Sequence, residues 1–298
     1  MLNGKISKKD KQAIGFTICL LLPAILHFCI FYLYINSQSF LLAFKDDNGF
    51  TLEYLDRFFK QVTTSGSDMS LSLRNTLIFF VFGNFLMLPL ALFFSYLLYK
   101  KIAGYKYFRI VFFLPSIISA VVMVTLYRYV VNGPVYSIVT GITGEKLPPF
   151  LSSTETALSF ILLYEFWLGI GGNMIIYAGA MSRVPQEVIE SAKIDGIGFW
   201  GEFFQMVLPL IWPTLSTMLL LSFINIFGAS GQILLFVPEM TDPKQIRTIA
   251  YWIFEQSTAL VPDYNGAAAA GFVFTLIQLP IVFLVRYISQ KLDSGVEY

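Results

Sequence analysis

Six apolar stretches, each about as long as a membrane-spanning helix, constrain this chain more than any other feature of its sequence. The stretches are Ala13–Tyr34, Asn75–Tyr99, Ile110–Val131, Ala157–Met181, Met206–Ala229 and Gly266–Ile288. A bilayer core of roughly 30 Å requires about 20 apolar residues in helical form. Backbone polar groups in lipid must pair within a helix or in a closed barrel, and the alternating pattern of a barrel is absent. The sequence therefore predicts an all-α membrane protein with six transmembrane helices.

Composition excludes several functional classes. Hydrophobic residues make up 56% of the chain and charged residues 13%, whereas a soluble domain carries about 25% charged residues. A soluble enzyme is therefore excluded, and lipid is the expected surroundings. The net charge of +1 excludes a basic nucleic-acid binder. One His and two Cys are too few for an all-protein zinc site or a disulfide scaffold, so no metal is expected.

The distribution of basic residues predicts the orientation of the chain. Most of the 20 Lys and Arg residues fall on the side that would hold both termini, so both termini are expected in the cytoplasm. The first apolar stretch is longer than the 7–15 residues of a secretory signal and lacks a small-x-small cleavage site, so a retained anchor helix is expected. We predict a cytoplasmic tail at residues 1–12 and one membrane domain at residues 13–298.

The cytoplasmic segment 182–209, between helices four and five, has a pattern of its own. Pro185 suits the first position of a helix, and Gly196 suits a left-handed helix stop. A second short helix is expected at Phe199–Gln205, before Pro209. These signals predict a helix–turn–helix exposed to the cytoplasm. They are equally compatible with an amphipathic linker that lies on the lipid headgroups.

The same segment resembles the EAA loop of the membrane subunits of binding-protein-dependent ABC importers. The resemblance rests on Glu190-Ser191-Ala192, Asp195-Gly196 and Val207-Leu208-Pro209, with Ser191 in place of the first Ala of the family pattern. Further similar stretches include Arg74-Asn75-Thr76 and Trp167-Leu168-Gly169-Ile170-Gly171. The resemblance covers nearly all of the chain from Ser72 onward and is nearest to the maltose and glycerol-phosphate type of permease.

The resemblance implies a bacterial cell-membrane protein with the type I ABC importer transmembrane fold, which imports a sugar. The chain contains no Gly-x-x-x-x-Gly-Lys-[Ser/Thr] phosphate loop, so ATP and Mg are expected on a partner subunit and no cofactor on this chain. The implied partners are a cytoplasmic ABC ATPase dimer, a second homologous permease in a heterodimer, and an extracytoplasmic solute-binding protein. The candidate ATPase-coupling residues are Glu190, Ser191, Ala192, Asp195, Gly196 and Pro209.

Polar and aromatic residues inside the helices supply candidates for the substrate path. Ionisable groups in membrane spans are costly and are functional candidates. Glu165 is the clearest case, and Arg128 is the alternative partner that would make it a structural ion pair. A sugar site also needs a flat ring and amide groups. The candidate substrate-path residues are Tyr164, Glu165, Trp167, Asn225 and Gln278.

Two further expectations concern space and surface. Gly169, Gly171 and Gly172 are expected to leave room beside Trp167 for a sugar ring. The last outer connection, 230–265, is expected to receive the binding protein, with exposed anchors that are aromatic or apolar. These anchors are Tyr251, Trp252 and Pro262.

Two other functional classes compete with a transport subunit. A stand-alone ion-coupled transporter would need paired carboxylates or His relays near the middle of the membrane and an inverted repeat. Only Glu165 approaches this requirement, and no such repeat is visible. A membrane-embedded enzyme would need clustered Asp, His or Ser motifs near one face, and the single His and scattered acids disfavour it.

Overall fold

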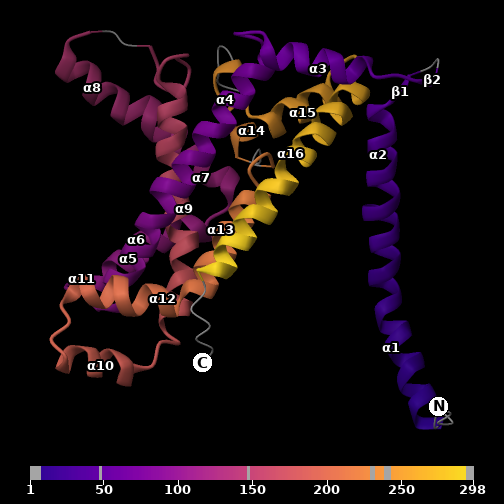
Figure 1. The fold of residues 1–298 in the computed structure, drawn as a ribbon. Helices are drawn as coiled ribbons and strands as arrows, with labels where there is room; N and C mark the ends of the chain where they lie inside the picture. The colour runs from indigo at the N-terminus through magenta and orange to yellow at the C-terminus, as the bar shows by residue number, and fades with distance from the viewer. Residues whose placement is uncertain (1–7, 47–48, 146–147, 229–231, 238–242, 293–298) are drawn as a thin grey trace. The chain divides into compact units, whose positions relative to one another are not determined.

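The computed structural model describes residues 8–46, 49–145, 148–228, 232–237 and 243–292. These residues are mostly helical (Figure 1). Four helices are long and apolar enough to cross a membrane, and two bent helix pairs bring the number to six if each pair is one span. The six predicted spans are therefore present, although two of them are not straight. The chain divides into two compact units, which are described separately.

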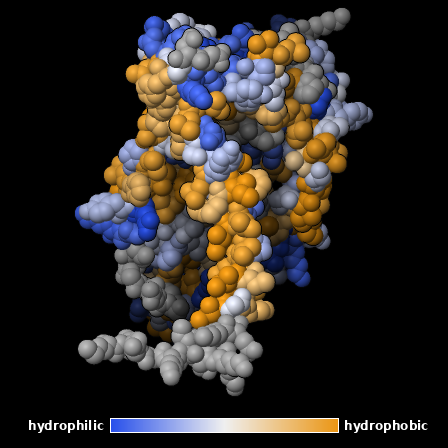
Figure 2. Space-filling view, turned by 90° about the vertical axis from the view of Figure 1, so that its right-hand side faces the viewer, coloured by the Kyte–Doolittle hydropathy of each residue, from blue (hydrophilic) through white to orange (hydrophobic). Residues whose placement is uncertain are grey.

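The first unit comprises residues 1–60 and 256–273. Its elements are α1 (Lys8–His27), the wide-turn helix η1 (Phe28–Tyr34), α2 (Ile35–Ala43), β1 (Lys45–Asp46), β2 (Gly49–Phe50), most of α3 (Glu53–Thr63) and the start of α16 (Tyr264–Lys291). The two strands are antiparallel, with Lys45 opposite Phe50. α1 begins inside the predicted tail, because residues 8–12 are helical. Apolar side chains from Ile14 to Leu42 are exposed along the continuous helix formed by α1, η1 and α2 (Figure 2), as expected of a lipid-facing span.

The second unit comprises residues 61–255 and 274–298. Its first elements are α4 (Asp68–Val81), η2 (Phe82–Met87), α5 (Leu88–Tyr99), α6 (Tyr105–Ile117), α7 (Ala120–Val130), η3 (Val131–Val135), α8 (Tyr136–Thr143) and α9 (Ala157–Met181). The following elements are α10 (Gln186–Ile194), α11 (Phe199–Gly201), η4 (Glu202–Val207), α12 (Leu208–Leu210), α13 (Trp212–Ile224), α14 (Ile233–Phe236), η6 (Pro243–Gln245) and α15 (Ile249–Thr258). The long α9 packs against α5 and α6, and this contact forms the centre of the unit.

Two predicted helices are bent. The span predicted at Ile110–Val131 turns by 111° between α6 and α7, where Ile118 and Ser119 have extended backbone angles. Pro115, one turn earlier, weakens this helix because proline cannot donate a backbone hydrogen bond. The span predicted at Met206–Ala229 turns by 71° at Ile211, just before Pro213 at the start of α13. Its last predicted residue, Ala229, lies outside the described residues.

Two buried clusters hold the second unit together. One joins α5, the inner half of α9 and the segment around α10 and η4. The other joins α7, the outer half of α9, α14 and the start of α15. Because both clusters include residues of α9, this helix connects the α10 end of the unit to its opposite end.

Candidate functional site

The segment 182–209 forms the predicted helix–turn–helix at one end of the second unit (Figure 1). Gly196 follows α10 with a φ of +80°, a conformation that favours glycine. The amides of Gly196 and Ile197 donate to the carbonyls of Lys193 and Ala192 at 3.1 and 3.0 Å. This is the hydrogen-bond pattern of a Schellman motif. The left-handed stop predicted at Gly196 is therefore confirmed.

The two faces of α10 differ in exposure. Glu190, Ser191 and Asp195 are exposed, whereas Ile189 and Ala192 are buried within the chain. Of the candidate coupling residues on α10, Ala192 therefore lies on the buried face and not beside the exposed Ser191. The physical reason is helical spacing, since Ala192 lies three residues after Ile189 and shares its face.

The second arm of this helix–turn–helix is anchored to the end of α5. The Nζ atom of Lys100 lies 2.8 and 2.9 Å from the two carboxylate oxygens of Glu202, whose side chain is only 4% exposed. The Tyr96 hydroxyl donates to the Phe199 carbonyl at 3.3 Å. Its ring also lies against Phe199 and Phe203, with centroid distances of 5.1 and 4.8 Å. These contacts tie the segment to a membrane helix.

Pro209 lies in α12, near the end of this arm. It occupies one of the first two positions of α12, where a missing amide proton is tolerated best. The 71° bend at Ile211 follows directly. Pro209 therefore lies where the cytoplasmic arm turns into the fifth span.

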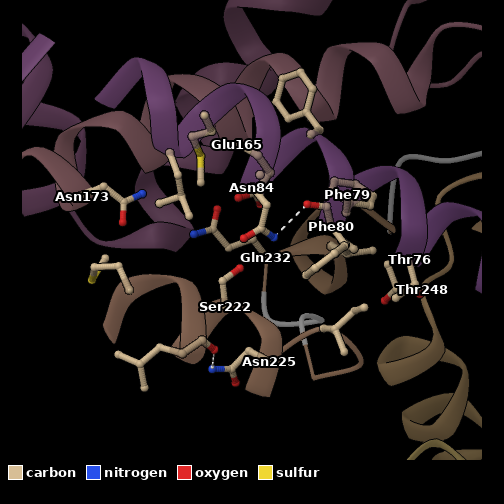
Figure 3. Close-up of a pocket in the computed structure, with 18 residues that line it drawn as sticks. Thr76, Phe79, Phe80, Asn84, Glu165, Asn173, Ser222, Asn225, Gln232 and Thr248 are labelled. Carbon is tan, nitrogen blue, oxygen red and sulfur yellow. Dashed lines mark hydrogen bonds between the residues drawn. The ribbon is translucent and has the colours of Figure 1, made fainter. Parts of the chain in front are cut away.

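A cavity of about 460 Å³ lies between α4, η2, α9 and α13 of the second unit. Figure 3 shows Glu165, Asn84 and Gln232 near its middle, Asn173 toward one end, and Thr76 with Thr248 toward the other. Phenylalanine, methionine and aliphatic side chains complete the lining. A largely apolar cavity with a few convergent polar groups is the usual form of a small-molecule site.

Of the five candidate substrate-path residues, Glu165 and Asn225 line this cavity. Tyr164 is fully buried, and its ring lies against other aromatic rings in the cluster around α7. Trp167 is half-buried against the same cluster. Gln278 donates its amide to the backbone carbonyls at the end of α13. The structure therefore brings two of the five together and places the other three in packing or helix-capping positions.

Glu165 does not form the ion pair that was the alternative expectation. The Arg128 guanidinium donates instead to the Leu235 carbonyl at 3.2 Å. Within the described part of the chain, the Glu165 carboxylate has neither a hydrogen-bond partner nor an ion-pair partner. It is therefore available to a solute in the cavity.

Two of the three glycines near Trp167 do not leave room for a sugar ring. A Cβ atom added at Gly171 would lie 2.0 Å from the Phe112 carbonyl oxygen, and one added at Gly169 would lie 2.1 Å from the sulfur of Met87. Gly172, in contrast, has nothing within 4 Å. Small residues at membrane-helix interfaces allow close backbone approach. Gly169 and Gly171 therefore serve helix packing, and the expectation that they leave space beside Trp167 was wrong.

At the opposite end of the unit, Asn75 holds the segment that precedes α15. Its Nδ2 atom lies within hydrogen-bond distance of the carbonyl oxygens of Lys244, Gln245 and Arg247, at 3.5, 2.9 and 3.0 Å. The Thr76 hydroxyl accepts from the Ile249 amide at 2.9 Å. Asn75 and Thr76 thus act locally as a clasp for residues 244–249.

The same region carries a group of ion pairs. Arg247, whose side chain is 7% exposed, contacts Asp68 at 3.1 Å and Glu255 at 2.7 Å. Two of the three expected outer anchors are absent from the surface, because Tyr251 and Trp252 are each 6% exposed. They are part of the fold, whereas Pro262 is exposed as expected.

Sequence reasoning missed three residues that shape these sites. Gln232 lies in apolar surroundings and far from Asn84 in the chain, so no local pattern marks the two as neighbours. The Lys100–Glu202 pair joins residues 102 positions apart. The available signal was Glu202 itself, an acid between Gly201 and Phe203 that a buried helix would not keep without a cation.

Comparison with known proteins gives one family match. The model of the family described as "Binding-protein-dependent transport system inner membrane component" matches residues 87–294. The chain is also 26% identical over 277 residues to the lactose transport system permease protein LacF of Rhizobium radiobacter, covering 90% of this chain and 92% of that protein. It is 24% identical over 282 residues to the sn-glycerol-3-phosphate transport system permease protein UgpA of Pectobacterium atrosepticum, covering 92% and 94%.

Solved structures show the same fold. A chain from the crystal structure of a bacterial ABC transporter involved in the import of the acidic polysaccharide alginate superposes with a TM-score of 0.81. The sequence identity is 23%, and the match covers 95% of this chain and 98% of that one. At this identity the likeness establishes the architecture alone.

Proposed function

The chain belongs to the family of binding-protein-dependent transport system inner membrane components, and from this premise we propose that it is the permease subunit of an ATP-driven sugar importer. The observation that carries the proposal is the family match over residues 87–294, which includes the α10 segment and much of the cavity. The names of the relatives, which include permeases for lactose and for arabinooligosaccharides, support a sugar or oligosaccharide as cargo.

The energy for transport would come from a separate ABC ATPase dimer that binds ATP and Mg in the cytoplasm. The exposed side chains of Glu190, Ser191 and Asp195 would form the docking face for that subunit. The buried Ile189 and the Lys100–Glu202 pair support this role, because Ile189 packs α10 against the core of the unit and the pair joins the second arm to α5. A push on α10 would therefore reach α5 and α9.

The cavity would form one side of the substrate path. Its amide groups and the unpaired Glu165 offer partners for sugar hydroxyls. A second homologous permease would supply the other side, and an extracytoplasmic solute-binding protein would deliver the sugar. The alternative of a stand-alone ion-coupled transporter has less support, because Glu165 is the single acid among the described residues of the cavity wall.

The first test compares two glycines of the proposed coupling segment. Gly196 and Gly198 both have nothing within 4 Å of an added Cβ, but only Gly196 has a positive φ. Gly196→Ala should lower sugar-dependent ATP hydrolysis and uptake in the complete importer, because it strains the turn by about 1 kcal/mol. Gly198→Ala should leave both rates unchanged. Equal rates for the two variants would remove the turn from the coupling path.

The second test measures ATPase association directly. Glu190→Lys reverses a charge on the exposed face of α10, and Glu155→Lys makes the same change at an exposed position near the start of α9. We expect the Glu190→Lys permease to reach the membrane at normal levels and to lose the ATPase on purification. The Glu155→Lys permease should retain the ATPase. Normal retention by both variants would contradict docking at α10.

A further inference from the structure

Three asparagine side chains in the cavity lining are oriented by a hydrogen bond to their own helix. The Nδ2 atoms of Asn84, Asn173 and Asn225 each donate to the backbone carbonyl four residues earlier, at 2.9 Å in every case. Two of these bonds are drawn in Figure 3. A backbone carbonyl can only accept, so this bond fixes which end of each amide is nitrogen. The amide oxygen and the second N–H of each amide remain for other partners.

Two of the acceptors in this wall lack a donor. The Oδ1 atom of Asn84 and the Oε1 atom of Gln232 are buried and have no hydrogen-bond partner among the described residues. Asn84 is only 6% exposed. A buried acceptor needs a donor, and a hydroxyl group of a bound solute would supply one. The wall is therefore built for a solute that donates hydrogen bonds.

Charge adds a second restriction. Among the described residues that line the cavity, Glu165 is the single ionisable group, and none is Lys, Arg or His. An ionised carboxylate or phosphate on a solute could not satisfy the two unpaired amide oxygens, because it carries only acceptors. It would also be moved out of water without a cation to pair with, beside the Glu165 carboxylate.

We propose that this cavity selects neutral, hydroxyl-rich saccharides and rejects carboxylated and phosphorylated ones, with Glu165 as the residue that sets the charge preference. This inference rests on the proposed function for its biological meaning. The relatives do not decide the question, because their names include both a neutral sugar, lactose, and an anionic solute, sn-glycerol 3-phosphate.

Thiol labelling inside the cavity tests the charge preference without transport. The purified importer would carry Ser222→Cys in the cavity wall, with Cys19 and Cys29 replaced by Ala. It would be treated with two methanethiosulfonate reagents, an anionic one that bears a sulfonate and a cationic one that bears a trimethylammonium group. Leu260→Cys, at a fully exposed position, gives the intrinsic rate of each reagent. After this normalisation, the cationic reagent should label Ser222→Cys about tenfold faster than the anionic one. This ratio is expected when a single nearby charge, the Glu165 carboxylate, is only weakly screened by solvent.

Glu165 variants assign the effect to a residue. Glu165→Gln keeps the size of the side chain and should reduce the normalised rate ratio toward one, whereas Glu165→Asp keeps the charge and should preserve the ratio. A ratio near one in the unmodified cavity, or a ratio unchanged by Glu165→Gln, would overturn the proposal.

Protection by sugars separates this inference from the proposed function. Maltotriose should slow the labelling of Ser222→Cys, and digalacturonate at equal concentration should not. Equal protection by both sugars would overturn the charge selection. A preserved charge ratio in an importer that takes up no saccharide would instead count against the proposed function and leave the electrostatics of the cavity established.

Discussion

Substitution of Gly171 by Ala tests the close contact between α9 and α6. Gly171 lies in α9, where an added Cβ would be 2.0 Å from the carbonyl oxygen of Phe112 and 3.0 Å from its carbonyl carbon. The next residue, Gly172, has nothing within 4 Å of an added Cβ. The two glycines thus form a matched pair on one helix. Each substitution adds the same methyl group, but only at Gly172 is there space for it.

The magnitude follows from the geometry. A carbon and a carbonyl oxygen approach to about 3.3 Å in ordinary close contacts, so α6 and α9 would have to separate by more than an ångström at this point. Overpacking costs about 1–3 kcal/mol, and a backbone oxygen that cannot rotate away belongs at the upper end of that range. Replacing Gly by Ala in a helix by itself stabilises the folded protein by about 1 kcal/mol. We expect a net loss of about 2 kcal/mol for Gly171→Ala, whereas Gly172→Ala should gain up to about 1 kcal/mol.

Thermal unfolding in detergent measures this difference. With about 2–4 °C per kcal/mol for chains of this size, Gly171→Ala should lower Tm by about 4–8 °C. Gly172→Ala should leave Tm unchanged or raise it. Gly169→Ala should have a milder effect than Gly171→Ala, because the atom in the way is the sulfur of the flexible Met87 side chain. Equal Tm values for the Gly171 and Gly172 variants would refute the close packing of α6 on α9.

Two further predictions concern the ends of the second unit. Lys100→Met should destabilise the protein by about 3 kcal/mol, because it leaves the buried Glu202 carboxylate unpaired. In thermal unfolding, the double variant Lys100→Met/Glu202→Met should recover most of this loss, and a failure to recover it would contradict the ion pair. Asn75→Ala should destabilise the protein by about 2 kcal/mol, because the carbonyls of Gln245 and Arg247 lose their donor. Limited proteolysis should then cut residues 243–249 faster, whereas Arg74→Ala, at the exposed neighbouring position, should leave the cutting rate unchanged.

The sequence predicts a span well where one continuous helix coincides with one apolar run. The bounds of α9, Ala157–Met181, coincide with the predicted fourth span because polar residues flank a continuous apolar run. The breaks at Ile118 and Ile211 could not be read in this way, since an apolar run stays apolar when its backbone bends. Pro115 and Pro213 were the available signals, and a proline inside an apolar run also occurs in continuous helices such as α16, which contains Pro280.

In the candidate site, features that depend on neighbouring residues could be predicted, and features that depend on distant residues could not. The left-handed turn at Gly196 was predictable because helix termination depends on a few neighbouring residues. The membership of the cavity was not, because its wall comes from helices far apart in the chain. Trp167 illustrates the difference, since an aromatic residue among glycines suits both a sugar site and a packed helix interface, and only the position of Met87 and Phe112 decides between them.

One continuous helical segment, Asp68–Tyr99, connects the features described above. Its outer end carries the Asn75 clasp, and its opposite end carries Tyr96 and leads into Lys100, which hold the second arm of the α10 segment. Between them lies η2, a stretch of wider turns whose Asn84 faces the cavity. Wide turns inside α-helices occur frequently at functional sites. A displacement of α10 passed on to α5 would thus reach the cavity wall along one helix, at the stretch of wide turns that carries Asn84.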